Sequence, residues 1–228
     1  MKVGLCIIGA IIQDKSMLYK SINSVEDLTD FDEKVILMDG LPEHGVPGAV
    51  EQYSKMLENL KVIKCEFNVK CFDENIYFKK MLRYLLDNYD CDYWLICQDD
   101  AVLDKCNIQN ILEDMIELGA TIISFPHKEI LKSTHWFDII EDIGGGYIAS
   151  HGWSERVFIL KSEPFKELIK NDERGENNFI DTIYHRKKNT TTWKTSSKDS
   201  QLEYWNDNWR CYLNNNILHK HLVGKRKI

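Results

Sequence analysis

The chain has 228 residues and a net charge of −7, with 36 acidic residues against 29 Lys and Arg. This acidic balance argues against a general nucleic-acid-binding protein. The absence of a run of about 18 apolar residues argues against a membrane-spanning helix. Seven cysteines without a Cys-x-x-Cys spacing argue against a disulfide framework or a zinc site, so we expect a reducing, cytoplasmic location.

The first half of the chain alternates between strand-like and helix-like patterns. Short apolar runs predict buried strands, and apolar residues spaced by three or four predict helices. The predicted strands cover residues 2–9, 34–40, 61–67, 93–97 and 121–125, and the predicted helices cover 16–25, 46–60, 78–89 and 108–116. This alternation predicts an α/β fold with a mostly parallel central sheet and helices on both faces.

Polar or conformationally permissive residues stand at three predicted strand ends. They are Gly9, Asp39 and the segment 98–100, which reads Gln-Asp-Asp. Ligands bind outside the carboxyl ends of strands in open sheets of this kind. Adjacent carboxylates repel each other unless a cation compensates, and Mg²⁺ or Mn²⁺ completes its shell with water and phosphate. The alternative is that Asp99 and Asp100 are turn residues or cap a following helix.

Two segments of the second half also carry candidate binding groups. In "HLVGKRK", the His221 imidazole can bind a metal, Gly224 permits close backbone approach, and Lys227 can reach a diphosphate. A disordered basic tail is the alternative. His219 would face the same side as His221 in an extended segment. Three consecutive glycines, ending at Gly146, let the backbone pass close to a ligand or to another segment.

The order of these motifs resembles that of nucleotide-sugar-dependent glycosyltransferases with the GT-A (Rossmann-like) fold. "QDD" stands where these enzymes carry Asp-x-Asp, and "HLVGKRK" looks like the His-x-x-Gly-x-x-Lys segment of retaining members. The resemblance covers most of the chain. The small size of the chain is more like that of viral or bacterial members than of Golgi enzymes, and a viral enzyme would be expected in the host cytoplasm. It implies one domain over 1–228, with a nucleotide-binding half (1–104) and an acceptor half (105–228).

The resemblance also implies roles for single residues. Asp100 and His221 would bind Mn²⁺ or Mg²⁺, and Asp99 would contact the ribose or share the metal. Asp39 would hydrogen-bond the base or ribose. The other implied donor-binding residues are Gly9 and Ala10 beside the base, Lys79 or Lys80 on the helix before the aspartates, Gly146, and Gly224 with Lys227 at the diphosphate. Gln98 departs from the family pattern because it lacks charge, which leaves fewer carboxylates for the metal.

Two further acids are candidates for the chemistry. Asp181 would be the general base of an inverting enzyme, or in a retaining enzyme a partner of the donor sugar or a nucleophile. Glu155, with Trp153, would form the acceptor side. A helix residue facing solvent and a core tryptophan are the structural alternatives for Asp181 and Trp153.

The resemblance implies a metal-dependent glycosyltransferase that transfers a hexose from a nucleotide sugar. We expect a UDP-sugar, with UDP-glucose as the first choice, an unknown glycan or protein acceptor, and retention of configuration. A nucleotidyltransferase is the runner-up, although "GAIIQDK" lacks the expected glycine-rich phosphate loop. A non-catalytic nucleotide- or carbohydrate-binding module is the third alternative. The oligomeric state is open, with a homodimer as one option.

Overall fold

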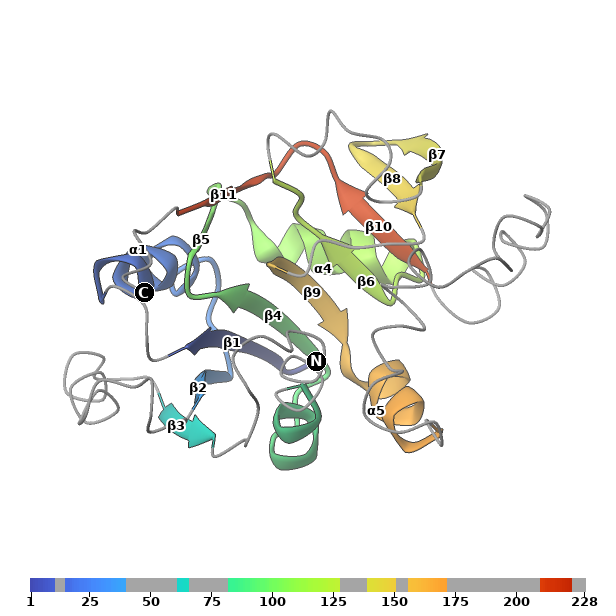
Figure 1. Cartoon of the computed structure of the whole chain (residues 1–228). Helices are drawn as coiled ribbons and strands as arrows, with labels where there is room; N and C mark the ends of the chain where they lie inside the picture. Colours follow the sequence, from blue (N-terminus) through green and yellow to red (C-terminus); the bar gives the residue numbers. More distant parts are fainter. Residues whose placement is uncertain are drawn as a thin grey trace, which may run out of the picture.

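The computed structural model describes residues 1–10, 15–39, 61–65, 82–127, 139–150, 156–171 and 210–222 (Figure 1). Residues 82–88 are helical. The other elements are, in chain order, β1 (Val3–Ala10), α1 (Lys15–Val25), β2 (Glu33–Asp39), β3 (Lys61–Cys65), β4 (Tyr93–Gln98), β5 (Ala101–Leu103), α4 (Ile108–Glu117), β6 (Ile122–Ser124), β7 (Ile139–Gly144), β8 (Tyr147–Ser150), β9 (Val157–Lys161), α5 (Ser162–Asn171), β10 (Cys211–Asn214) and β11 (His219–His221).

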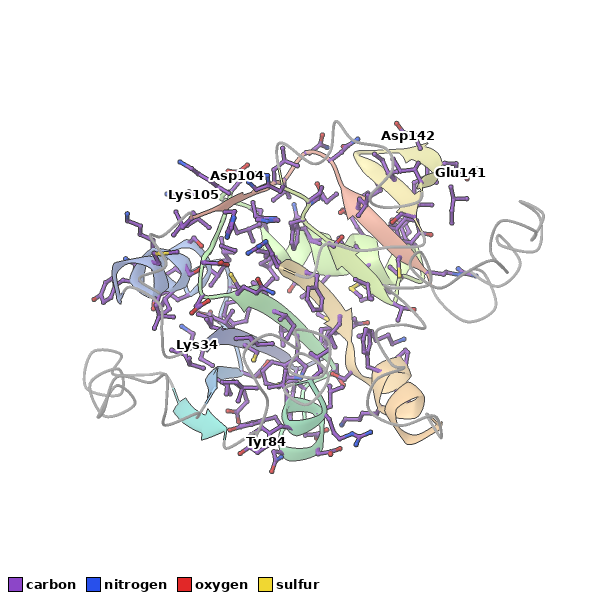
Figure 2. All side chains as sticks on the ribbon, in the orientation of Figure 1. Lys34, Tyr84, Asp104, Lys105, Glu141 and Asp142 are labelled. Carbon is purple, nitrogen blue, oxygen red and sulfur yellow. The ribbon has the colours of Figure 1, made fainter. Side chains whose placement is uncertain are left out.

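Nine strands form one mixed sheet in the order β3-β2-β1-β4-β9-β6-β10-β8-β7. Strands β3, β2, β1 and β4 are parallel neighbours, and β9 lies antiparallel between β4 and β6. Strand β10 is parallel to β6, β8 is antiparallel to β10, and β7 is antiparallel to β8. Lys34 on β2 and Asp142 on β7 lie toward opposite ends of the sheet (Figure 2). The predicted α/β class is confirmed, with the continuous parallel part in the first half of the chain.

Both faces of the sheet are covered by helices. Leu5 and Ile7 belong to a cluster that includes apolar residues of α1 and α4. Cys6 and Ile8 belong to a second cluster, which includes residues of the segment 82–88 and of α5. Successive side chains of a strand point to opposite faces, so the apolar run of β1 supplies both clusters. The prediction of helices on both faces is therefore confirmed.

The predicted elements match the described ones closely where the two can be compared. Strand ends differ by at most two residues, and the helices at α1 and α4 begin within one residue of their predicted positions. Helix α4 begins after Asn107, whose side-chain oxygen accepts hydrogen bonds from the backbone N–H groups of Gln109 and Asn110 at 2.9 and 3.3 Å. The predicted helix 46–60 lies outside the described residues. None of the described helices is long and apolar enough to cross a membrane.

A two-stranded sheet that the sequence patterns did not predict joins β5 to β11. The strands are antiparallel, with His221 opposite Ala101 and His219 opposite Leu103. Just beyond the paired residues, the Leu222 backbone N–H donates to the Asp100 carbonyl at 2.7 Å. The pairing therefore carries the end of the described chain to the carboxyl end of β4.

Candidate active site

The buried strand β4 ends in a turn that is held on both sides. Residues 93–97 of the strand are buried and Gln98 is half-buried. The Gln98 N–H donates to the Arg156 carbonyl at 2.8 Å, and the Asp99 N–H donates to the Ile8 carbonyl at 3.0 Å. These bonds fix the turn between β1 and the residue that precedes β9. The two aspartates are therefore presented from a rigid sheet edge.

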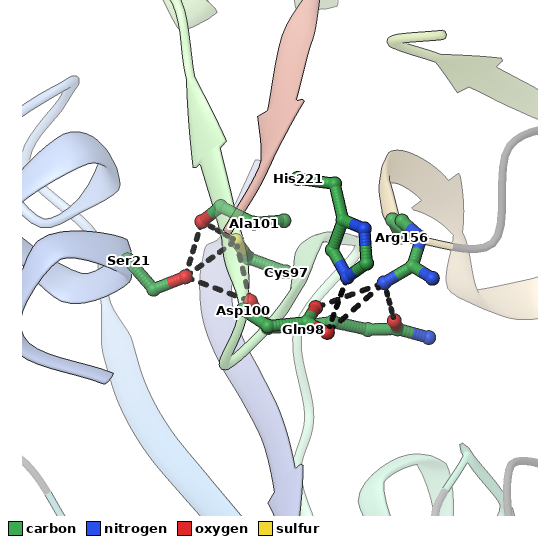
Figure 3. A network of polar contacts seen from close by, with 7 residues as sticks. All are labelled: Ser21, Cys97, Gln98, Asp100, Ala101, Arg156 and His221. Carbon is green, nitrogen blue, oxygen red and sulfur yellow. Dashed lines mark hydrogen bonds and ion pairs between the residues drawn. The ribbon is translucent and has the colours of Figure 1, made fainter. Parts of the chain in front are cut away.

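The Asp100 carboxylate is the centre of a polar cluster that also contains Gln98, Arg156 and His221, which we call the Asp100 cluster (Figure 3). Arg156 Nη1 donates to Asp100 Oδ1 at 3.0 Å and Oδ2 at 3.1 Å, and to Gln98 Oε1 at 3.2 Å. His221 Nε2 lies 2.8 Å from Asp100 Oδ2. The His221 ring nitrogen and the Asp100 carboxylate oxygen therefore face each other at hydrogen-bond distance.

The cluster lies between the protein interior and solvent. The Asp100 side chain is 15% exposed, and those of Arg156 and His221 are 34% and 31% exposed. Ion pairs at such positions are screened less than surface pairs. Solvent still reaches each group, so a ligand that arrives from solution can exchange with the groups that contact Asp100.

Asp99 points away from solvent and lies against β1. The residue is 6% exposed. A Cβ atom added to Gly9 would lie 2.8 Å from Asp99 Oδ2, which is closer than real Cβ atoms approach such a neighbour. The space at Gly9 is therefore occupied by the Asp99 carboxylate. This contact gives the glycine a packing reason in addition to its predicted place beside the base.

Helix α1 contacts the turn through Ser21. Ser21 Oγ donates to the Gln98 carbonyl at 2.8 Å and also contacts the Ala101 carbonyl (Figure 3). The Cys97 side chain beside it is fully buried. Burial raises the pKa of the Cys97 thiol to about 12, and the charges of Asp100 and Asp99 add to this effect. The thiol therefore stays protonated and is unsuited to nucleophilic chemistry.

His219 is near the cluster but belongs to the core. It is 1% exposed, its Nδ1 donates to the Phe125 carbonyl at 2.5 Å, and its ring meets the His127 ring edge-on at 5.4 Å. Burial lowers the pKa of His219 to about 4, and positive charge on His127, Arg156 and His221 would lower it further. A neutral His219 thus lies in the protein interior, while His221 contacts Asp100.

Asp100 and His221 have the chemistry and the spacing of two ligands of one divalent ion. Two donors about 2.1 Å from an octahedral ion, at right angles, lie about 3 Å apart. The observed separation of His221 Nε2 and Asp100 Oδ2 is 2.8 Å. Among the described residues, no group of three or more His, Cys, Asp and Glu side chains could hold a metal ion. An ion held by this pair would take the rest of its shell from water and phosphate.

The structure places some of the other candidate residues at the same sheet edge. Ala10 and Asp39 are opposite each other at the ends of β1 and β2, and the adjacent Gly9 contacts Asp99. Gly146 lies instead in the turn between β7 and β8, where an added Cβ would lie 2.0 Å from Asn216 Nδ2. The remaining candidates stay predictions because they lie outside the described residues: Lys79, Glu155, Asp181, Gly224 and Lys227.

Arg156 is the residue of the cluster that the sequence patterns did not single out. It precedes the apolar run of β9, just as the aspartates follow the apolar run of β4. Because β4 and β9 are antiparallel neighbours, with Cys97 opposite Val157, the beginning of β9 lies beside the end of β4. An acidic pair after one apolar run and an arginine before another are only a weak signal of this contact, because the sequence does not say which strands are neighbours.

No family model and no curated protein matches the sequence. Among solved structures, S. aureus TarS matches with a TM-score of 0.56 and 12% identity, over 98% of this chain and 37% of TarS. A TarS 1–349 structure in complex with UDP-GlcNAc matches with a TM-score of 0.53 and 14% identity, over 99% and 60%. The Pyrobaculum calidifontis mannosyltransferase PcManGT, in complex with GDP-Man and Mn²⁺, matches with a TM-score of 0.55 and 11% identity, over 98% and 58%.

These similarities concern the fold. The chain has the GT-A-like fold that its sequence resemblance implies. It spans between 37% and 60% of the chains in these three structures.

Proposed function

We propose that the chain is a metal-dependent glycosyltransferase that transfers a hexose from a nucleotide sugar. The observation that carries this proposal is the approach of His221 Nε2 to Asp100 Oδ2 at 2.8 Å, across 121 residues of sequence. The contact lies at the carboxyl end of β4, where ligands bind to sheets of this kind. Solved proteins of similar fold, TarS with UDP-GlcNAc and PcManGT with GDP-Man and Mn²⁺, add support.

The donor in this proposal is a UDP-sugar, with UDP-glucose first, and the acceptor is a glycan or a protein. Residues 1–104 form the nucleotide-binding half and residues 105–228 the acceptor half. Asp39, Gly9 and Ala10 contact the base or ribose from the ends of β2 and β1, and Asp99 orients the ribose.

Asp100 and His221 hold Mn²⁺ or Mg²⁺ in this scheme. A bound divalent ion supplies positive charge that stabilises the departing nucleoside diphosphate. The chain's own contribution is to fix the two ligands on paired strands, since β5 and β11 place Ala101 opposite His221. The Gln98 side chain is neutral, so it orients Arg156 by accepting its N–H at 3.2 Å without adding negative charge.

The remaining roles rest on the resemblance. Lys227 and Gly224 approach the diphosphate, and Lys79 reaches the donor. Asp181 contacts the donor sugar or acts as the nucleophile, and Glu155 lies on the acceptor side.

Retention of configuration follows in this proposal from the resemblance of "HLVGKRK" to the segment of retaining enzymes. Slow hydrolysis of UDP-glucose gives a direct test without the acceptor. Proton NMR of the first product, before its anomers equilibrate, should show α-glucose. Initial release of β-glucose would replace retention by inversion and would make Asp181 a candidate general base.

Calorimetric titration tests the function itself. UDP, UDP-glucose, UDP-GlcNAc and GDP-mannose are titrated with and without Mn²⁺ into the wild type, Asp100→Asn and the control Asp142→Asn. Asp142 is an exposed acid whose Oδ1 accepts the Gly144 N–H at 2.9 Å in the β7–β8 hairpin. We expect Mn²⁺-dependent binding that falls about 100-fold, or about 3 kcal/mol, in Asp100→Asn.

The control should bind as the wild type does. Binding that is independent of Mn²⁺ and unaffected by Asp100→Asn would favour a non-catalytic binding module. Failure of all four nucleotides to bind the wild type would overturn the proposed function. A preference for one sugar nucleotide would identify the donor.

A further inference from the structure

Resting on the proposed function, we propose that the Arg156 guanidinium competes with a divalent cation for the Asp100 carboxylate. The guanidinium occupies the carboxylate in the ligand-free protein. A nucleoside diphosphate offers it another anionic partner and so releases Asp100 for the metal. Metal and nucleotide therefore bind cooperatively, and Arg156 sets the size of the cooperativity.

The contacts of Asp100 show that the carboxylate is already used. Arg156 Nη1 lies 3.0 Å from Oδ1 and 3.1 Å from Oδ2, and His221 Nε2 lies 2.8 Å from Oδ2. Both carboxylate oxygens thus accept a hydrogen bond from a side chain. A divalent ion bound to either oxygen would lie close to the guanidinium, and like charges at this range repel. The ion can bind fully only when Arg156 moves away.

Arg156 is built so that its side chain can move while its backbone stays fixed. Its carbonyl accepts the Gln98 N–H at 2.8 Å, next to the pairing of β4 with β9. Its side chain is 34% exposed, and each of its side-chain contacts to Gln98 and Asp100 is made by Nη1. A rotation of the side chain therefore changes the partner of the guanidinium without breaking the sheet.

A diphosphate is the suitable alternative partner. Guanidinium groups match phosphate geometry with two parallel N–H donors and are more weakly hydrated than ammonium groups. The carboxyl edge of β4, where Arg156 lies, is where the fold places ligands. A diphosphate that enters this edge carries more negative charge than Asp100. It can therefore attract the guanidinium and the metal at the same time.

Thermodynamic linkage makes this exchange measurable. If the nucleotide removes Arg156 from Asp100, it raises the affinity for the metal, and the metal raises the affinity for the nucleotide by the same factor. In a variant without the positive charge at 156, the Asp100 carboxylate is free of the guanidinium from the start. Such a variant should bind the metal more tightly alone and gain less from the nucleotide.

The test measures Mn²⁺ binding directly, by electron paramagnetic resonance of the free ion, without and with UDP. The variants are Arg156→Gln and Arg156→Lys, with Arg210→Gln as the matched control. Arg210 also precedes a strand of the large sheet, but its Nη1 contacts the Leu118 carbonyl at 3.4 Å. Melting curves of all variants establish that they fold.

Arg156→Gln should bind Mn²⁺ alone about tenfold more tightly than the wild type, and UDP should increase its Mn²⁺ affinity about tenfold less. Arg156→Lys, which keeps the charge but loses the planar fork, should fall between the two, and Arg210→Gln should match the wild type. Unchanged or weaker Mn²⁺ binding by a folded Arg156→Gln would overturn the competition. The same holds if neither wild type nor Arg156→Gln binds Mn²⁺.

The outcome also separates this inference from the proposed function. If Arg156→Gln binds Mn²⁺ more tightly but no variant binds UDP or the other nucleotides, the competition stands and the glycosyltransferase proposal fails. If UDP binds the wild type only with Mn²⁺ and Arg156→Gln keeps the full coupling, the proposed function stands and the competition fails.

Discussion

The turn after β4 contains the Gln-Asp-Asp motif, and the turn between β7 and β8 contains the three consecutive glycines. The two turns are stabilised in different ways. At the first turn, Asp100 is contacted by Arg156 and His221, which are 56 and 121 residues away. The second turn depends first on its own backbone, because Gly144, Gly145 and Gly146 all have positive φ, at 78, 62 and 89°. Charged groups at the end of a buried strand need distant partners, whereas a glycine run satisfies its turn locally.

The two turns are also far apart in the sheet. Strand β8 is four places from β4 in the strand order, or about 19 Å at the usual spacing of strands. The hairpin is attached to α4, where Tyr147 donates its hydroxyl hydrogen to Asp114 Oδ2 at 2.6 Å. Substitutions in the hairpin should therefore alter stability alone, and substitutions at the β4 turn should alter stability and ligand binding together.

The largest expected effect contrasts Gly9→Ala with Gly145→Ala. A Cβ atom at residue 9 would lie 2.8 Å from Asp99 Oδ2. A Cβ atom at residue 145 would have no atom within 4 Å, but the backbone there has a φ of 62°. Overpacking should cost about 2 kcal/mol at Gly9, and the left-handed backbone about 1 kcal/mol at Gly145. The melting temperature should fall by about 4–8 °C in Gly9→Ala and by about 2–4 °C in Gly145→Ala.

Nucleotide titration of the same pair sharpens the comparison. Gly9→Ala should also weaken Mn²⁺-dependent binding of UDP, because it displaces Asp99 beside Asp100. Gly145→Ala should bind UDP as the wild type does. Equal losses of binding in the two variants would contradict the separation of the hairpin from the site.

The next effect is an acid-side loss of stability at His219. The folded protein holds this imidazole neutral because burial lowers its pKa to about 4, while an unfolded histidine takes up a proton near pH 6.5. The unfolded state therefore binds more protons between these values, and the free energy of unfolding falls as the pH falls. Relative to pH 8, this loss should be about 1.4 kcal/mol at pH 5.5.

Urea unfolding at several pH values measures this contribution. His219→Asn is the matched variant, because its amide nitrogen can replace Nδ1 as donor to the Phe125 carbonyl but does not titrate. It should lose this part of the acid dependence. An identical decline in wild type and variant would assign the acid sensitivity to other groups.

The smallest effect is expected at Tyr147 in the hairpin. Burial, and then the hydrogen bond to Asp114, raise the pKa of the Tyr147 phenol above its ordinary value. The contribution of this group to stability is thus fully present below pH 10, and it is lost as the pH rises further because the unfolded tyrosine ionises first. Tyr147→Phe should lower the free energy of unfolding by about 1 kcal/mol at neutral pH.

The difference between wild type and Tyr147→Phe should therefore shrink above pH 10. Chemical unfolding at pH 7, 9 and 10.5 checks this, and UDP titration at pH 7 should give the same affinity for both proteins. A constant difference across this range would show that the phenol does not ionise on unfolding. A loss of UDP affinity would connect the hairpin to the site.

Local patterns were sufficient to predict much of the fold. Burial gives a strand or helix a repeating pattern of apolar residues, and this pattern can be read from residues that are close in sequence. The runs of β1 and β4 and the stripe of α4 are patterns of this kind. The contact of His221 with Asp100 agrees with the pairing of candidates drawn from the resemblance, although their role as metal ligands stays a prediction. The β5–β11 pairing was not predicted because three-residue strands carry too little periodicity.

The sequence by itself determined which segments are buried, and it placed two carboxylates at the end of a buried strand. Only the tertiary structure decided which groups surround them. Strand β9 enters the sheet antiparallel beside β4 and brings Arg156, and β11 pairs with β5 and brings His221. Hydrophobic periodicity is a property of neighbouring residues, whereas these contacts depend on strand pairing across 56 and 121 residues, which no local pattern specifies.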